Sequence, residues 1–522
     1  CRAVLFAQLV DDPSSHPDKF PTDEAIETER KRLFAIIEEL VKWDNSSNDK
    51  LMLKARAEII NSCDGQLPEI HDPFSGGGSI PLEAQRLGLK STGSDLNPVA
   101  VTIGKATIEI PSIFKDSQPV HPGGKDKGFY RNCEGLAEDV KYYGEKIYNR
   151  AFKKLNHIYS IPNNDNQTIL GWIWARTVPS PDPAFSKFET PLITNFILNS
   201  KKGQETWLEP EVDKSNGQIL YKICRGSDNR AISIAKTGTK SGRGANFVCL
   251  YSGAAITPKY VRQMAKEHKL NDEIIALVVK NTSGRSFLEV DEYQKELAKN
   301  VTPTWLPVGE MNTESSDLVS GRGYSITQWD QLFTKRQLST LSILIDLISE
   351  CTEEIRLNAE HNFGENQTGF LKNCDVSANS YAEAVTIYLG LAASRLADSL
   401  NKHCRWAPDK VQLKNMFGRQ AIPMTWDYFE ANPFAKASGD FLTSVTTVAK
   451  VLERFIPLGS GRVNQNDAQS VEYSKNCVIS TDPPYYDNIA YADLSDFFFA
   501  WLKPTAKSIY PDVFSYLATP KE

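Results

Sequence analysis

The sequence predicts an α/β fold in which a parallel, Rossmann-like sheet holds a nucleoside-containing ligand. Two stretches far apart in the 522-residue chain support this: a glycine loop between a strand and a helix, and an acidic, proline-rich stretch at 481–487. The third observation is Asp95, which follows a second candidate strand. An acid at the end of the second strand is placed to hydrogen-bond ribose hydroxyls in doubly wound folds.

The glycine loop lies in residues 69–81, which read Glu-Ile-His-Asp-Pro-Phe-Ser-Gly-Gly-Gly-Ser-Ile-Pro. We expect a short strand, then a helix with Ser79 as its N-cap and Gly88 as its stop. Three consecutive glycines let the backbone approach a ligand without interference from Cβ atoms. The loop is not G-x-G-x-x-G, and the chain has no G-x-x-x-x-G-K-[ST], so a dinucleotide enzyme and an ATPase are both weakly indicated.

The strand expected before Asp95 is the weakest of the predicted elements. Its residues, 91–94, are polar and include a glycine, which is a poor strand signal, so a glycine-rich surface loop is the alternative. Asn97 and Pro98 then form a good helix start.

The acidic stretch, Thr-Asp-Pro-Pro-Tyr-Tyr-Asp at 481–487, follows an apolar run at 477–479 that predicts a buried strand. Pro483 and Pro484 fix their own φ angles and lack N–H donors, which leaves nearby carbonyls free to accept hydrogen bonds. Asp482 can accept a hydrogen bond from an amino group, and Tyr485 can stack on a planar ring. These groups suit an exocyclic amine held for attack, although Asp-Pro and Pro-Pro also occur in ordinary turns.

The order of these motifs resembles that of amino-group methyltransferases that use S-adenosylmethionine. Further stretches resemble the large adenine-specific DNA methyltransferases of prokaryotic defence islands, which carry a zinc-ribbon-like insert between the two methyltransferase motifs. The resemblance covers nearly the whole chain, and the stretches that carry it are 135–140, 172–178, 417–427 and 430–434. It implies a Rossmann-like S-adenosylmethionine-dependent methyltransferase sheet interrupted by a large α+β insert, which combines a degenerate zinc ribbon with a helical layer.

The resemblance also implies the roles of individual residues. S-adenosylmethionine would be held by the glycine loop and the second acid, through Asp72, Pro73, Phe74, Gly76, Gly78, Asp95 and Asn97. The catalytic shelf would be Asp482, Pro483, Pro484 and Tyr485. It would hold the N6 amine of an adenine flipped out of DNA, with Tyr485 stacked on the base. The implied role is self/non-self marking in phage defence or restriction-modification, with other defence-system proteins as possible partners.

Several alternatives remain open from the sequence. Cytosine N4 presents a similar amine to such a shelf. The acceptor could also be RNA or a protein glutamine, but relatives that modify glutamine generally carry Asn where this chain has Asp482. A methyltransferase fold kept only for binding nucleic acid is the remaining alternative.

The chain departs from the relatives at the zinc-ribbon cysteines. Ser180 and Phe185 stand at the first cysteine pair, and Cys249 and Ser252 stand at the second. One thiolate cannot close a tetrahedral zinc site, so we expect no metal. The insert is instead expected to be held by packing around Phe185, Phe188 and Phe247.

We divide the chain into residues 1–178, the N-terminal helices and cofactor half; 179–292, the insert; 293–415, a helical segment; and 416–522, the catalytic half. Apolar spacing predicts helices within 24–60, 325–403 and 494–502. The segment Thr334-Lys335-Arg336-Gln337, at the head of one of them, could present charge to nucleic acid. The basic stretch 225–243 could track phosphates, with a solvated loop as the alternative. The chain starts without Met, and little sequence follows residue 502, so we expect a fragment that is incomplete at both ends.

Composition sets broader limits. The formal net charge of −6 argues against a uniformly basic surface, but a local basic groove is enough to bind nucleic acid. Nine cysteines occur without a C-x-x-C pair, which indicates neither a disulfide framework nor an intact zinc ribbon. Reduced thiols in a cytoplasmic protein are the simplest interpretation of these cysteines, and no apolar run is long enough to span a membrane.

Overall fold

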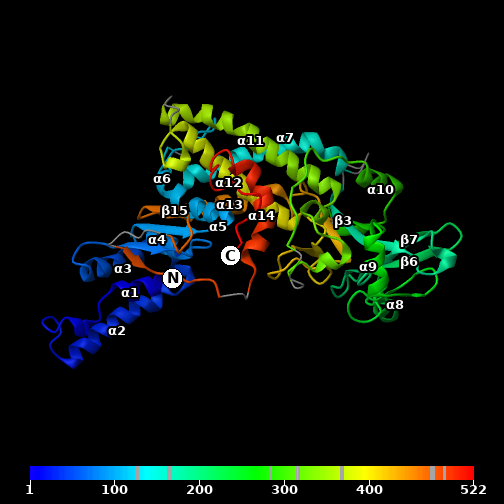
Figure 1. Cartoon of the computed structure of the whole chain (residues 1–522), viewed down its shortest axis with the longest axis horizontal. Coiled ribbons are helices and arrows are strands. Elements are labelled where there is room, and N and C mark those ends of the chain that lie inside the picture. The colour runs from blue at the N-terminus through cyan, green and yellow to red at the C-terminus, as the bar shows by residue number, and fades with distance from the viewer. Residues whose placement is uncertain are drawn as a thin grey trace.

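The computed structural model describes residues 1–124, 128–160, 167–282, 284–312, 314, 318–364, 369–470, 477–485 and 489–521. Figure 1 shows two regions of mixed helix and strand, one formed by the N-terminal part of the chain and one by the insert, with long helices running along one side of both. The fold is mixed α/β, with one parallel sheet and several antiparallel ones.

The parallel sheet, called sheet A here, takes strands from both ends of the sequence. Its order is β15-β2-β1-β16, and neighbouring strands are parallel throughout. The strands are β1 (Glu69–Asp72), β2 (Ser91–Asp95), β15 (Gly461–Gln465) and β16 (Cys477–Ile479). The register aligns Ile70 of β1 with Ser91 on one side and Val478 on the other. The carboxyl ends of all four strands therefore lie at one edge.

The strand before the glycine loop, β1, and the polar strand that ends at Asp95, β2, both form as the sequence predicts. Helix α4 (Ser79–Arg86) follows the loop, and Gly88 ends it with a φ of +78°. The predicted N-cap is wrong: Ser79 is the first helical residue, and Gly78 occupies the cap with a φ of +79°. The predicted burial of β16 is also wrong, because Ile479 keeps 46% of its surface exposed. No neighbouring strand within the described residues covers that side of β16.

The helices that precede β1 and those that follow β1 and β2 pack around sheet A. The N-terminal helices bury one apolar stripe against α4, through residues such as Phe6, Leu40 and Ile59. They are α1 (Arg2–Leu9), α2 (Asp23–Leu40) and α3 (Asp49–Ser62), joined by the short turns η1 (Pro13–Ser15) and η2 (Trp43–Ser47). After β2 come α5 (Pro98–Gly104), the π-helical turn η3 (Lys105–Glu109) and α6 (Ile110–Ile113).

The antiparallel sheet, called sheet B here, forms the centre of the second region. Its order is β11-β10-β3-β14, and β4 also pairs with β3. Its strands are β3 (Thr168–Pro179), β4 (Glu189–Leu192), β10 (Asn271–Asn281), β11 (Gly284–Leu288) and β14 (Asp427–Ala431). Ten of the twelve residues of β3 are buried, so this strand lies at the core of the region.

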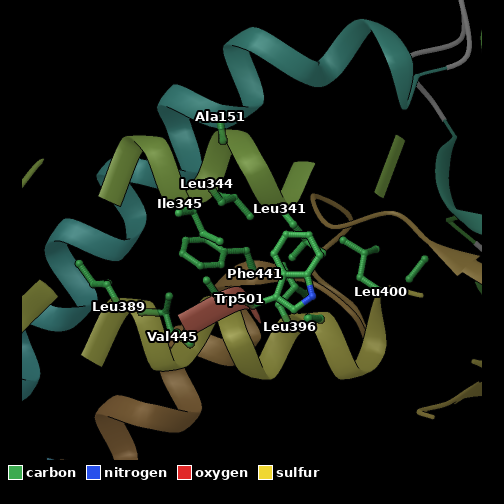
Figure 2. Close-up of a cluster of buried hydrophobic side chains, with 14 of the residues drawn as sticks. Ala151, Leu341, Leu344, Ile345, Leu389, Leu396, Leu400, Phe441, Val445 and Trp501 are labelled. Carbon is green, nitrogen blue, oxygen red and sulfur yellow. The ribbon is translucent and has the colours of Figure 1, made fainter. Parts of the chain in front are cut away.

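The long helices form the largest apolar core, part of which Figure 2 shows around Trp501. There, Leu341 and Ile345 of α11 face Leu396 of α12 across Phe441. The helices are α7 (Glu134–Leu155), α10 (Glu292–Lys299), α11 (Lys335–Phe363), α12 (Ala378–Ser399), α13 (Phe441–Leu452) and α14 (Tyr491–Ala506). Short turns accompany them: η4 (Asn156–Ile158), η6 (Ser320–Tyr324), η7 (Trp329–Leu332) and η8 (Leu371–Asn373).

The insert adds small sheets and helices to the edge of sheet B. They are η5 (Pro183–Phe185), β5 (Ile197–Asn199), β6 (Thr206–Asp213), β7 (Gln218–Arg225), α8 (Asn229–Ala235), β8 (Phe247–Val248), β9 (Ala255–Ile256), α9 (Pro258–Lys266), β12 (Arg405–Ala407) and β13 (Gln412–Lys414). Phe185 and Phe188 pack on Tyr251, and Phe247 is fully buried, so the predicted aromatic packing is present.

Cys249 and Ser180, two of the four positions that the resemblance compares with zinc ligands, are in contact. The Cys249 Sγ lies 3.1 Å from Ser180 Oγ. Within the described parts of the chain, no group of three or more His, Cys, Asp or Glu side chains is placed to hold a metal ion.

Arg336 is not available to nucleic acid, which corrects that part of the expectation for the head of α11, whereas Lys335 beside it is exposed. Its guanidinium is fully buried 3.8 Å from the centroid of the Trp172 ring, and its Nη2 donates to Glu430 Oε2 at 2.5 Å. None of the helices built from described residues has the length and apolar character needed to cross a membrane.

Candidate functional site

Three predicted site segments meet at the carboxyl edge of sheet A. β1 ends at Asp72, β2 ends at Asp95, and the chain leaves β16 towards Thr481. Thr481 Oγ1 donates to Asp72 Oδ1 at 2.7 Å, across 409 residues of sequence. Ser75 N also donates to Ser94 O at 2.9 Å, which ties the glycine loop to the end of β2. The edge is therefore one connected site.

Asp95 holds the glycine loop and the next helix together. Its Oδ2 accepts from Gly76 N at 2.9 Å, and its Oδ1 accepts from Asn97 N at 2.8 Å. Asn97 in turn caps α5, because its Oδ1 accepts from Val99 N at 3.0 Å. The Asn97 Nδ2 donates to Ser495 Oγ in α14 at 2.8 Å, which connects the predicted cofactor half to the helix after the shelf.

The glycines of the loop serve two different purposes. A Cβ on Gly78 would lie 2.7 Å from Ile108 Cδ1, so this glycine lets the loop pack closely on η3. A Cβ on Gly76 or Gly77 would meet no described atom within 4 Å, so these two residues border open space. Phe74 borders the same loop with 39% of its side chain exposed, whereas Pro73 is buried behind it. The open side of the loop can accommodate a ligand.

The edge carries a concentration of negative charge. Asp72 is only 2% exposed, and burial raises its pKa above the usual aspartate value. Hydrogen bonds from Thr481 and Phe74 N oppose this rise, while the nearby charges of Asp95 and Asp482 add to it. Burial also raises the pKa of Asp95. A cationic group, or hydroxyls that donate hydrogen bonds, would complement these carboxylates.

The shelf lies on the surface beside them. Residues 481–485 are all exposed, and Tyr485 keeps 63% of its side chain in solvent. Its hydroxyl donates to Asp482 Oδ1 at 3.1 Å, and this bond raises the pKa of Tyr485. Tyr486 and Asp487, which complete the acidic stretch in the sequence, lie outside the described residues.

Three site residues were missed in the sequence. Thr481 connects the shelf to Asp72, and Ser495 connects α14 to Asn97. Ser75 is buried, and its hydroxyl has no hydrogen-bond partner among the described residues. Thr481 and Ser75 are direct neighbours of the motif residues, so their positions were a usable signal. No such signal marked Ser495, because its contact with Asn97 depends on how α14 packs against the rest of the protein.

Comparison with known proteins adds little to this geometry. A family model described as a protein of unknown function, DUF1156, matches residues 1–36, which cover α1 and most of α2. Neither a curated protein nor a solved structure matches the chain.

Proposed function

We propose that this chain is an S-adenosylmethionine-dependent methyltransferase that acts on the N6 amine of an adenine flipped out of DNA. The observation that carries the proposal is the meeting of the glycine loop, Asp95 and the Asp482 shelf at one edge of a parallel sheet. Numbered along the chain, the strands of sheet A have the order 3-2-1-4, which begins the classic doubly wound order. Ligands of such sheets bind beyond the carboxyl ends of the strands.

The residues at this edge fit the cofactor. Gly76 and Gly77 leave space for it, and exposed Phe74 offers an aromatic face to its adenine. The carboxylates Asp72 and Asp95 suit a positively charged sulfonium ligand that also carries ribose hydroxyls. When bound, S-adenosylmethionine supplies an electrophilic methyl group.

The shelf residues would act on the amine. The lone pair of an exocyclic nitrogen is delocalised into the base, which makes it a poor nucleophile. Asp482 accepts one hydrogen bond from the amine and a carbonyl of the Pro483–Pro484 segment accepts the other, so the nitrogen becomes more tetrahedral and its lone pair is aimed at the methyl carbon. Most of this effect is positioning and electrostatics.

Tyr485 has to change partners in this mechanism. In the structure its hydroxyl binds Asp482, the same carboxylate that would accept from the amine. Entry of the base would release that bond and let the exposed ring stack on the flipped base, a contact worth about 1–3 kcal/mol. The Asp at position 482 favours a nucleobase over a glutamine amide, because glutamine-modifying relatives generally carry Asn there. The role in defence-related marking rests on the family resemblance alone.

The test is nucleoside mass spectrometry of plasmid DNA from cells that express the full-length protein. N6-methyladenine should appear with the wild type and disappear with Asp482→Ala. Asp409→Ala, which removes an exposed carboxylate in the turn between β12 and β13, should keep it. N4-methylcytosine would move the proposal to the other base. Absence of methylation together with no S-adenosylmethionine binding by calorimetry would overturn it.

A further inference from the structure

A second candidate site lies where the insert meets residues 320–327 and 424–426, away from sheet A. It is a cleft of about 780 Å³ between the loop before β8, helix α9, turn η6 and the segment that leads into β14. Its lining includes three cationic side chains, Lys240, Arg262 and Arg322, and no acidic residue lines it among those that the structure describes. The chain as a whole has a net charge of −6, so this is a local reversal of sign.

Aromatic rings form one wall of the cleft. Tyr324 meets Trp426 edge-to-face, with 4.9 Å between the ring centroids, and Trp426 packs in turn on Phe247 at 5.3 Å. The guanidinium of Arg262 lies 5.9 Å from the centre of the Tyr324 ring. Arg262 is solvent-exposed, and Arg322 and Tyr324 are partly exposed on the lining of the cleft.

The wall is held rigidly by sheet B. The Arg176 backbone N–H in β3 donates to Trp426 O at 2.8 Å, and its side-chain Nε donates to Thr425 O at 2.8 Å. Arg176 is buried, so both hydrogen bonds are shielded from water. A cleft that keeps its shape without ligand loses little conformational entropy on binding.

The third cation, Lys240, already has contacts within the protein. Its ammonium donates to Gly244 O and lies 5.0 Å from the centre of the Phe247 ring. Burial lowers its pKa, although the charge of Asp427 opposes the change. A bound anion would offset that desolvation, so the cleft as a whole favours negative charge.

Hydrogen bonds fix the segments beside the cleft. Ser320 N, at the start of η6, donates to Ile422 O at 3.0 Å, in the segment that leads to Trp426. Asn312, which does not line the cleft, donates from Nδ2 to Asp493 Oδ2 in α14 at 3.2 Å. Two residues along that helix, Ser495 accepts from Asn97 of the candidate methyltransferase site. Helix α14 therefore contacts that site and Asn312.

We propose that this cleft binds the phosphodiester backbone of the same DNA, away from the target base, with Arg262 and Arg322 on phosphates and Tyr324 against a sugar or base. The choice of DNA as the occupant rests on the proposed function. The preference of the cleft for an anion follows from its charge and shape alone. Phosphates have the charge that the cleft favours, and arginine forks match their geometry. An aromatic ring beside cations is typical of nucleic-acid grooves.

The test measures binding of the full chain to a fluorescein-labelled DNA duplex by anisotropy over a range of salt concentrations. The double variant Arg262→Gln/Arg322→Gln should bind more weakly. The slope of log K against log salt should become shallower by about 0.9 for each lost phosphate contact. Lys259→Gln/Lys266→Gln is the matched control, because it removes two exposed positive charges from α9 that do not line the cleft.

The outcomes separate this proposal from the previous one. An unchanged slope in the cleft variant, or an equal loss in the control, would overturn the cleft as a DNA site. Displacement of DNA by a stoichiometric mononucleotide would identify a small-molecule pocket and also overturn it. Cleft-dependent DNA binding without methyl transfer would support the cleft while the proposed enzyme fails. Thermal unfolding of both double variants confirms that each is folded.

Discussion

Sheets A and B differ in the length of their strands and in where they place their polar residues. The strands of sheet A have three to five residues, and β2 reads Ser-Thr-Gly-Ser-Asp. The central strand of sheet B, β3, has twelve residues and buries Trp172 and Trp174. Polar groups in sheet A gather at one edge beside the open side of the glycine loop, whereas those in sheet B are paired inside the core.

The comparison indicates a division between chemistry and stability. Glu430 in β14 accepts hydrogen bonds from Trp174, Thr334 and Arg336, and it is fully buried. The shelf residue Asp482 is exposed, and among the described hydrogen bonds its side chain accepts only from Tyr485. Loss of the first carboxylate should destabilise the protein, and loss of the second should affect only the reaction.

The largest effect is expected from Glu430→Ala. It leaves the buried Arg336 guanidinium without its charged partner, so the free energy of unfolding should fall by about 3–5 kcal/mol. Urea denaturation of wild type and variant measures this loss. The double variant Arg336→Met/Glu430→Leu removes both charges and should lose much less. Equal stability of Glu430→Ala and wild type would remove the basis of the comparison.

The second-largest effect is expected from a change at Asp482, beside sheet A. Asp482→Asn should lower the methyl-transfer rate by about 100- to 1,000-fold, because the amide presents a donor and a weaker acceptor to the amine. Its unfolding free energy should stay within about 0.5 kcal/mol of wild type, since the side chain is exposed. A purified-protein assay with tritiated cofactor and DNA measures the rate. A stability loss as large as that of Glu430→Ala would contradict the division.

Acid should weaken the sheet B region through His403. Burial, reinforced by the charge of Arg176, lowers the pKa of His403 to about 3. The folded protein therefore keeps this ring neutral while the unfolded chain protonates it, so stability present above pH 6.5 is lost as the pH falls towards 3. The loss from pH 7.5 to pH 5 should be about 2 kcal/mol.

The measurement compares urea unfolding of wild type and His403→Gln at both pH values, because other groups titrate in both proteins. The difference in stability between the two proteins should shrink or reverse at pH 5; a constant difference would exclude His403 as the cause. Asp72 in sheet A has the opposite sign: its raised pKa gives stability below the unfolded aspartate pKa that is lost as the pH rises through the folded value.

The smallest effect is expected from Tyr485→Phe. This change keeps the ring but removes the hydroxyl that donates to Asp482, a bond worth about 0.5–1.5 kcal/mol that the mechanism breaks anyway. The KM for DNA should therefore stay the same or fall slightly. Tyr485→Ala, which also removes the stacking ring, should raise the KM for DNA by a factor that corresponds to about 1–3 kcal/mol of lost binding free energy. If both variants raise KM equally, the hydroxyl and not the ring is the functional group.

Local sequence signals were sufficient for the elements of the site. The glycine loop and Gly88 lie where backbone preferences placed them, because each depends on a few consecutive residues. The strand before Asp95 forms despite its poor local signal, where it pairs with β1 and β15. The sequence also indicated the long helices, through apolar residues that recur every three to four positions.

Only the tertiary structure decided which segments became neighbours. β15 joins sheet A with the sequence Gly-Arg-Val-Asn-Gln, which has no marked apolar pattern and is stabilised by its pairing with β2. Arg336 is buried because Glu430, 94 residues later, is there to receive it. The cationic cleft likewise combines residues between 240 and 426. Such contacts depend on pairing partners distant in the chain, whereas propensity and periodicity report only on neighbours in sequence.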